Sequence, residues 1–318
     1  MTLIEASTVG VAEMFSSVAL REARSRVYRL AKVTPLKRVG PTHLQVKCEQ
    51  YQAYGSFKVR GAASHVLKLP RDLRKPIATV SSGNHARAVA YAAQARGLDC
   101  HLFLPGGVML SKVDFLRAHF PDFKIDVVNR HVSDLESDVA EDPNLHYVPA
   151  YDNVDVILGQ ASVGFEILER AQRPPACIFV PLGGGGLLAG VAAAVRSLGA
   201  DTKIFGVEPS ARREGYPEQT ICDGARVPRP GSLNQRLIDE YVDGVVGADD
   251  SLVRSALREL GDHSLRVEPT SALSLAGLRK LQNAGLPYDD HECVIVATGG
   301  NIDRGQWTRH AALQRKPN

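Results

Sequence analysis

One lysine of this chain has the neighbours that amine chemistry requires. Lys58 lies in the run Gly55-Ser56-Phe57-Lys58-Val59-Arg60-Gly61-Ala62, between an aromatic and a β-branched side chain. Partial burial in such an apolar patch lowers the pKa of a lysine, because a poorly solvated ammonium is unfavourable. The neutral amine is the form that condenses with a carbonyl to give a Schiff base. The alternative for this run is the start of a helix that carries a surface lysine.

A second run joins a polar loop to an expected helix start. The sequence Ser81-Ser82-Gly83-Asn84-His85-Ala86 directly follows the apolar run 77–80. Backbone N–H groups in a loop that opens a helix bind anions such as a carboxylate. The Asn84 amide both donates and accepts hydrogen bonds. The alternative is an ordinary asparagine cap after a glycine turn.

Four consecutive glycines make the third run. Gly183, Gly184, Gly185 and Gly186 lie between the apolar run 177–181 and a helical pattern that begins at Leu187. Without side chains, successive N–H groups can converge on a phosphate, and the helix dipole supports the negative charge. The run lacks the Gly-Lys-Ser/Thr of a P-loop and the spaced glycines of a dinucleotide fold. The alternative, a flexible loop, is costly to order without a ligand.

The fourth run repeats the pattern of a strand followed by glycines. Ala297-Thr298-Gly299-Gly300-Asn301 follows the strand-like residues 292–297. It places the hydroxyl of Thr298 at the end of a strand. The alternative is a tight turn without a ligand.

These four runs need a scaffold, and the rest of the chain predicts one. Short runs rich in β-branched residues predict strands at 44–48, 77–81, 100–104, 124–128, 177–181, 203–207 and 292–297. Helical patterns follow most of them, at 84–96, 108–118, 187–198, 251–260 and 271–284. This alternation predicts an α/β fold with mostly parallel sheets covered by helices. Ligands of such sheets bind at the carboxyl ends of strands, where the informative runs lie.

Composition excludes several classes of partner. The 318 residues carry a net charge of +3 with no basic run interleaved with aromatics, so no nucleic acid partner is expected. No apolar run approaches the roughly 20 residues of a membrane helix. Residues 1–10 lack a signal-peptide pattern, so we expect a cytoplasmic location. The five cysteines are scattered without CxxC spacing, which predicts reduced thiols.

Taken in this order, the four runs resemble the fold type II pyridoxal 5′-phosphate (PLP) enzymes, in the serine/threonine dehydratase and serine racemase branch. The resemblance extends from Thr34 to Asp303. It implies a tryptophan synthase β-like fold of two domains. The large cofactor-binding domain would comprise residues 1–76 and 153–318, and the small inserted domain residues 77–152. PLP would lie in the cleft between them, and a homodimer is implied.

The resemblance also assigns roles by position. Lys58 would hold PLP as a Schiff base and act as the base on one face, while Ser82 would be the acid or base on the opposite face. Asn84 would bond the ring 3′-oxygen, and Thr298 would face the pyridine nitrogen. The full set of expected cofactor contacts is Phe57, Lys58, Asn84, Asn153, Gly183, Gly184, Gly185, Gly186, Leu187 and Thr298. The expected contacts of the amino-acid substrate are Ser81, Ser82, Gly83, Asn84 and His85.

A metal site is implied as well. Glu208, the backbone carbonyl of Arg212, and Glu214 match positions where dehydratase relatives bind a divalent cation. Two carboxylates with a carbonyl suit Mg²⁺ or Ca²⁺. The alternative is a surface carboxylate pair, and the intervening arginines are unfavourable for a cation.

Three further residues bear on the substrate. Glu268 matches a family position near the site, without an assigned role. Arg87 stands where relatives usually carry glutamine. Arg130 could bind a second carboxylate, as a hydroxyaspartate substrate would need, although a surface arginine is the simpler interpretation.

The resulting hypothesis is an ammonia-lyase that acts by α,β-elimination on a small β-hydroxy amino acid such as serine, threonine or a hydroxyaspartate. A hydroxyl at Thr298 cannot keep the pyridine nitrogen protonated as a carboxylate would, which favours elimination over transamination. The alternatives within the fold are a serine racemase-like enzyme and a β-replacement synthase. From other classes, a non-catalytic binding protein and a nucleotide-dependent oxidoreductase remain as alternatives.

Overall fold

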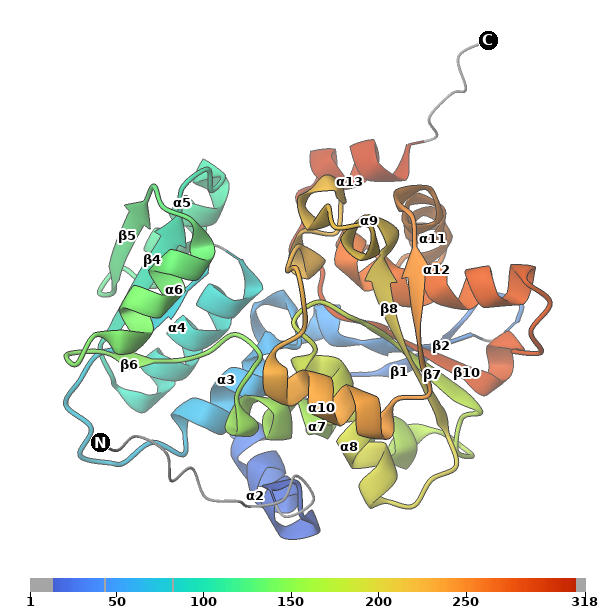
Figure 1. Ribbon diagram of the computed structural model, residues 1–318, viewed down its shortest axis with the longest axis horizontal. Helices are drawn as coiled ribbons and strands as arrows, with labels where there is room; N and C mark the ends of the chain where they lie inside the picture. The colour runs from blue at the N-terminus through green and yellow to red at the C-terminus, as the bar shows by residue number, and fades with distance from the viewer. Residues whose placement is uncertain (1–13, 43, 82, 313–318) are drawn as a thin grey trace.

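Two separate sheets organise the computed structural model, which describes residues 14–42, 44–81 and 83–312 (Figure 1). The larger sheet has the order β1-β2-β10-β7-β8-β9. Its pairs are parallel except for the edge pair of β1 with β2. The strands are Leu36–Val39 (β1), Leu44–Cys48 (β2), Cys293–Ala297 (β10), Cys177–Pro181 (β7), Lys203–Pro209 (β8) and Gly244–Ala248 (β9). The predicted α/β class with parallel sheets is thereby confirmed.

The smaller sheet is entirely parallel and has the order β5-β4-β3-β6. Its strands are Ile77–Val80 (β3), Cys100–Pro105 (β4), Lys124–Val128 (β5) and His146–Tyr147 (β6). The intervening helices are Asn84–Arg96 (α4), Leu110–His119 (α5) and Val132–Glu141 (α6). All of these elements fall inside the residues assigned above to the small domain, whose boundaries stay a prediction.

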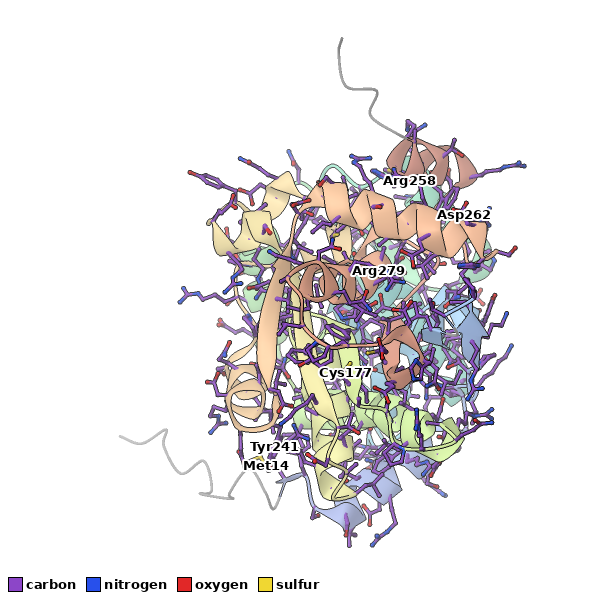
Figure 2. All side chains as sticks on the ribbon, turned by 90° about the vertical axis from the view of Figure 1, so that its right-hand side faces the viewer. Met14, Cys177, Tyr241, Arg258, Asp262 and Arg279 are labelled. Atoms are coloured by element: carbon purple, nitrogen blue, oxygen red, sulfur yellow. The ribbon has the colours of Figure 1, made fainter. Side chains whose placement is uncertain are left out.

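Helices cover both faces of the larger sheet. One face packs against Asp250–Asp262 (α11) and Pro269–Asn283 (α12) in a single hydrophobic cluster. Figure 2 places Arg258 and Asp262 of α11, and Arg279 of α12, above Cys177 of β7. A second cluster joins the other face to Val154–Arg170 (α7), Gly186–Ser197 (α8) and Ser232–Tyr241 (α10). The remaining α-helices are Ser17–Val27 (α2), Lys58–Val66 (α3), Ser210–Arg213 (α9) and Arg304–Ala311 (α13).

Burial on both faces explains why the central strands read as continuous apolar runs. Every residue of β2, β7 and β10 is buried. The longest of the described helices, α7, is buried from Val156 to Ile167 and was not predicted, because its glycines and β-branched residues lower helix propensity. Neither α7 nor any other helix of the described part is long and apolar enough to cross a membrane.

Helix α3 is anchored by four charged side chains that are buried together. Arg60 donates to Glu49 at 2.7 Å and to Glu166 at 2.6 Å, and Lys47 pairs with Glu166. None of the four is more than 1% exposed. Two positive and two negative charges balance one another, which a dry interior requires. Arg60 lies two residues after Lys58, so this group fixes the start of α3.

Candidate active site

Lys58 is the first residue of α3, and it is half-buried. Its Nζ donates to the backbone carbonyl of Ala150 at 2.7 Å. Burial lowers the pKa of Lys58 to about 8, while the negative charge of Glu136 acts in the opposite direction. A substantial fraction of the amine is therefore neutral just above neutral pH, as the sequence predicted for Schiff-base chemistry.

The loop that carries Lys58 is bonded to the loop that carries Thr298. The N–H of Phe57 donates to the carbonyl of Thr298 at 3.0 Å, and the N–H of Gly300 donates to the carbonyl of Gly55 at 3.0 Å. A β-bridge joins Ser56 to Gly299 between these bonds. The first and last runs of the sequence therefore meet at the carboxyl end of β10.

Thr298 is buried and paired with another hydroxyl. Its Oγ1 lies 3.0 Å from Oγ of Ser271 on α12. The Ser271 hydroxyl also accepts from the N–H of Gly299 at 2.7 Å, which holds the turn in place. Sequence reasoning missed Ser271, because a serine inside a helix carries no signal of its own. The pair offers uncharged donors and acceptors at this strand end.

Asn84 is held on both sides of its amide. Its Nδ2 donates to Glu268 Oε1 at 2.8 Å, and its Oδ1 accepts from Asn301 Nδ2 at 2.7 Å. The cap of α4 is Gly83, without a side-chain bond, so the alternative of an ordinary asparagine cap is wrong. Burial raises the pKa of Glu268 to about 7. The sequence assigned no role to Glu268, and the structure places it in hydrogen-bond contact with Asn84.

The rest of the second run is only partly described. Ser82, the predicted second catalytic residue, lies outside the described residues. Ser81 accepts a hydrogen bond from the N–H of Gly83 at 3.2 Å, which shapes the turn before α4. His85 is buried with Nε2 at 3.0 Å from the carbonyl of Val148, and burial lowers its pKa to about 3. Its imidazole is therefore a neutral donor to the backbone, and its predicted substrate contact stays a prediction.

The glycine loop between β7 and α8 excludes side chains by close packing. A Cβ on Gly184 would lie 2.2 Å from the ring of Tyr151, and one on Gly183 would lie 2.7 Å from the carbonyl of Gly224. Gly185 has a φ of +93°, which favours glycine. The loop leads directly into α8, whose first N–H groups have no partner within the helix. Such a terminus fits a phosphate.

Asn153 has a structural task in the described part of the chain. Its Oδ1 accepts from the N–H groups of Asp155 at 2.9 Å and Val156 at 3.2 Å, so it caps α7. The same oxygen lies 3.2 Å from Nδ1 of His65. Its predicted cofactor contact stays a prediction. The helix cap alone is a sufficient structural reason for an asparagine at this position.

The proposed metal ligands are arranged around arginines. Glu208 lies 3.3 Å from a guanidinium nitrogen of Arg212 and 3.2 Å from one of Arg213. Glu214 is exposed at the end of α9. Because two guanidinium groups already neutralise Glu208, a cation would have to displace them. The geometry therefore does not support Mg²⁺ or Ca²⁺ at this place.

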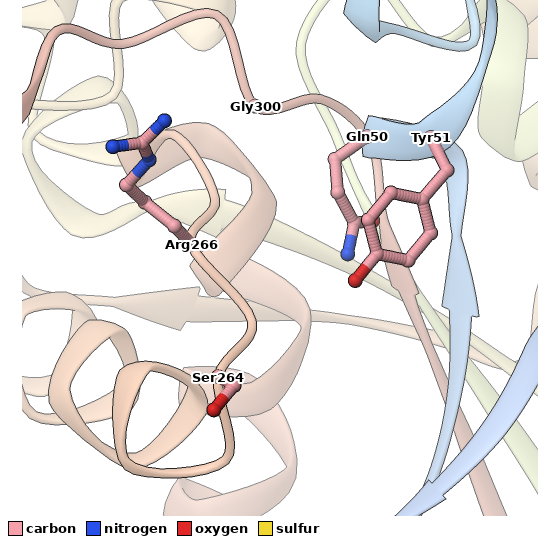
Figure 3. Close-up of a pocket in the computed structure, with 5 residues that line it drawn as sticks. All are labelled: Gln50, Tyr51, Ser264, Arg266 and Gly300. Atoms are coloured by element: carbon pink, nitrogen blue, oxygen red, sulfur yellow. The ribbon is translucent and has the colours of Figure 1, made fainter.

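A separate pocket of about 420 Å³ opens beside Gly300 (Figure 3). It is lined by Gln50, Tyr51, Ser264, Arg266 and Gly300. The amide of Gln50 has no hydrogen-bond partner among the described residues. Since the lining does not include Lys58, Asn84 or the glycine loop, this pocket is distinct from the site predicted from the sequence.

Comparisons with known proteins give consistent results. A family model described as pyridoxal-phosphate dependent enzyme matches residues 20–299, which include Lys58, the glycine loop and Thr298. L-threo-3-hydroxyaspartate ammonia-lyase of Saccharomyces cerevisiae is 33% identical over 308 residues, covering 89% of this chain and 92% of the yeast protein. The structure of the processed form of threonine deaminase isoform 2 from Solanum lycopersicum has a TM-score of 0.82 at 26% identity, covering 94% of this chain and 95% of that one. Maize serine racemase has a TM-score of 0.81 at 28% identity, covering 91% and 94%.

Proposed function

Because the chain belongs to the pyridoxal-phosphate-dependent enzyme family, we propose that it is an ammonia-lyase that converts a small β-hydroxy amino acid to a keto acid and ammonia. The family, the fold class and the prediction of an enzyme are confirmed. The observation that carries the proposal is the half-buried Lys58 amine, in a loop bonded to the Thr298 loop. The candidate substrates are serine, threonine and a hydroxyaspartate.

The residues present fit PLP. Lys58 supplies the amine, the glycine loop and Leu187 at the start of α8 supply phosphate donors, and Thr298 supplies a hydroxyl. The Asn84 amide keeps one Nδ2 proton beyond its bond to Glu268. When bound, PLP supplies an electron sink for the negative charge that develops at the substrate α-carbon.

Lys58 is the residue that moves the α-proton in this proposal. Its pKa of about 8 places the neutral amine within reach near physiological pH, and a base matched to its medium transfers protons efficiently. The carbonyl of Ala150 fixes the direction of Nζ when the amine is free. Phe57, which precedes the lysine, donates its N–H to Thr298 and so holds the lysine loop against the hydroxyl pair.

The Thr298 and Ser271 hydroxyls favour elimination. Neither carries a charge, so the pair cannot hold a proton on a ring nitrogen as a carboxylate would. Negative charge at the α-carbon is then stabilised less, and prompt loss of the β-hydroxyl is favoured over a long-lived carbanion. This supports a lyase over a transaminase.

A racemase is the second candidate, supported by the likeness to maize serine racemase. It would need an acid or base on the face opposite Lys58, for which Ser82 stays a prediction. A β-replacement synthase and a non-catalytic binding protein on the same fold are weaker alternatives. In a protein without cofactor chemistry, the retained Lys58 and glycine loop would serve no purpose.

Product analysis tests the proposal. The purified protein is loaded with PLP and given L- and D-serine, threonine and threo-3-hydroxyaspartate, with keto acid and ammonia measured together. We expect equal amounts of both products from at least one substrate, and none from Lys58→Ala. Inversion of the configuration at the α-carbon without release of ammonia would contradict the lyase proposal and support the racemase.

The assembly and the cellular location are further parts of the proposal. We expect a homodimer in the cytoplasm, with no nucleic acid or membrane partner. A divalent cation at Glu208, the Arg212 carbonyl and Glu214 stays a prediction, and the ion pairs of Glu208 count against it.

A further inference from the structure

Arg87 is a half-buried cation that forms no ion pair with an acid of the described part of the chain. Its Nη1 donates to Asn301 Oδ1 at 2.9 Å, and its guanidinium carbon lies 3.7 Å from the centre of the Phe115 ring. Among the described residues, no carboxylate forms an ion pair with it, and the guanidinium makes no second hydrogen bond. Burial lowers its pKa. A desolvated charge without a counter-ion gains strongly from an incoming anion.

The position of Arg87 ties it to the site. Asn301, which accepts from Arg87, donates to Asn84 at 2.7 Å, and Asn84 in turn donates to Glu268. Arg87 lies one turn beyond Asn84 on α4, while Asn301 follows the Thr298 loop of the larger sheet. The guanidinium therefore bridges the two sheet units beside the predicted substrate loop. Phe115 covers one face of its plane, and Nη2 and Nε donate to no acceptor in the described part of the chain.

Two other cations of the small-sheet part, Lys112 and Arg130, already have acidic partners. Lys112 lies 3.3 Å from Asp223, and the exposed Arg130 pairs with Asp138. The expectation that Arg130 could bind a second carboxylate therefore loses its support. The negative charge of Glu268 raises the pKa of Arg87 without an ion pair between them. The raised pKa of Glu268 itself keeps part of this carboxyl uncharged near neutral pH, so it balances Arg87 only in part.

We propose that Arg87 determines specificity by binding a second carboxylate carried on the substrate β-carbon. A planar guanidinium with free donors matches a carboxylate through two parallel hydrogen bonds. The substrate class is then a 3-hydroxyaspartate rather than serine or threonine. This inference rests on the lyase function proposed above and narrows its substrate.

Ligand binding tests the inference without turnover. L-aspartate and L-asparagine have the same shape, differ in the charge of the β-substituent, and lack a β-hydroxyl that could leave. Their dissociation constants are measured by titration calorimetry on the PLP-loaded protein, for wild type, Arg87→Gln, Arg87→Lys and the matched control Arg130→Gln. We expect a preference for aspartate that falls about 10- to 100-fold in Arg87→Gln. Arg87→Lys should keep part of the preference for aspartate over asparagine, and Arg130→Gln should keep all of it.

The outcomes separate this inference from the lyase proposal. Equal affinity for the two ligands in the wild-type protein overturns the carboxylate site without any variant. A preference that survives in correctly folded Arg87→Gln overturns the role of Arg87. If the preference behaves as expected but no β-hydroxy amino acid releases ammonia, the carboxylate site stands and the lyase proposal fails.

Discussion

At the scale of the residue, the central feature is an amine that loses its proton easily. Lys58 combines half-burial, a carbonyl partner at 2.7 Å and a pKa of about 8. Desolvation accounts for the lowered pKa of Lys58, since the charge of Glu136 raises it. The apolar neighbours Phe57 and Val59 in the sequence made this burial predictable.

The rate of PLP uptake should follow this pKa. Only the neutral amine reacts with the PLP aldehyde, so the rate should rise about tenfold per pH unit below pH 8 and level off above it. Mixing the cofactor-free protein with PLP in a stopped-flow spectrometer between pH 6 and 10.5 measures this. A rate that keeps rising to pH 10.5, the ordinary value of a lysine, would contradict the lowered pKa.

Glu268 should make stability depend on pH. Its pKa is raised from 4.5 to about 7 in the folded protein, so the folded state disfavours the charged carboxylate. Well below pH 4.5 the carboxyl is protonated in both the folded and the unfolded state, so it does not change the free energy of unfolding there. As pH rises from 4.5 to 7, only the unfolded chain ionises freely, and stability falls by about 3 kcal/mol.

Urea unfolding of wild type and Glu268→Gln at pH 5 and pH 8 measures this effect. The neutral glutamine keeps an oxygen that accepts the hydrogen bond from Asn84. The free energy of unfolding of the variant should therefore rise relative to that of the wild type between pH 5 and pH 8. Glu218→Gln, at an exposed position, is the matched control and should follow the wild type. Parallel pH dependence of wild type and Glu268→Gln would show that Glu268 titrates normally.

At the scale of the element, α3 and the glycine loop carry the residues proposed to bind PLP. Helix α3 starts at Lys58 and is anchored by the buried group of Arg60, Lys47, Glu49 and Glu166. Removing one member leaves an uncompensated buried charge. We expect Arg60→Met to reduce the free energy of unfolding by about 3 to 5 kcal/mol.

Chemical denaturation at 25 °C checks this, with Arg24→Met as the control. Arg24 forms a partly exposed pair with Glu169, and such a pair contributes about 0 to 1 kcal/mol. Equal losses in the two variants would mean that the buried group does not anchor α3 more firmly than a surface pair does.

The glycine loop should tolerate no methyl group at Gly184. A Cβ there would lie 2.2 Å from Tyr151, so the loop or the ring must move. We expect Gly184→Ala to weaken PLP binding about tenfold or more, because the phosphate donors shift with the loop. Gly244→Ala on β9, whose nearest neighbour lies at an ordinary 3.4 Å, is the control. Equilibrium dialysis measures the dissociation constant of PLP for both variants. An unchanged constant in Gly184→Ala would show that the loop does not bind the phosphate.

The element scale also separates what the sequence could predict from what it could not. The bounds of β2, β5, β7 and α4 agree with the prediction, because apolar β-branched runs and an alanine-rich helix give strong local signals. Strands β1, β6 and β9 and helices α2, α6, α7, α9, α10 and α13 were not predicted. These strands are short or glycine-containing edge elements that tertiary pairing stabilises, and propensity carries little weight there.

At the scale of the whole molecule, contacts join runs that are far apart in the sequence. Lys58 bonds to Ala150, and the ring of the next residue, Tyr151, lies against Gly184. Asn84 bonds to Asn301, which follows the Thr298 loop. The order of the motifs allowed the Lys58, Asn84, glycine-loop and Thr298 runs to be predicted together, since parallel sheets gather ligands at strand ends. Ser271, Asn301 and the Arg87 contact required the three-dimensional structure, because each acts through a partner far away in the chain. The metal prediction lacks support because Glu208 pairs with Arg212 and Arg213, the arginines that the sequence already indicated as unfavourable for a cation.

The most direct test of the account is to find the lysine that holds the cofactor. The PLP-loaded protein is reduced with borohydride, digested, and its peptides are analysed by mass spectrometry. The account predicts a phosphopyridoxyl group on Lys58 and on no other lysine, with no label in Lys58→Ala. A label on a different lysine, or none in a protein shown to be folded, would contradict the assignment of Lys58 and the function built on it.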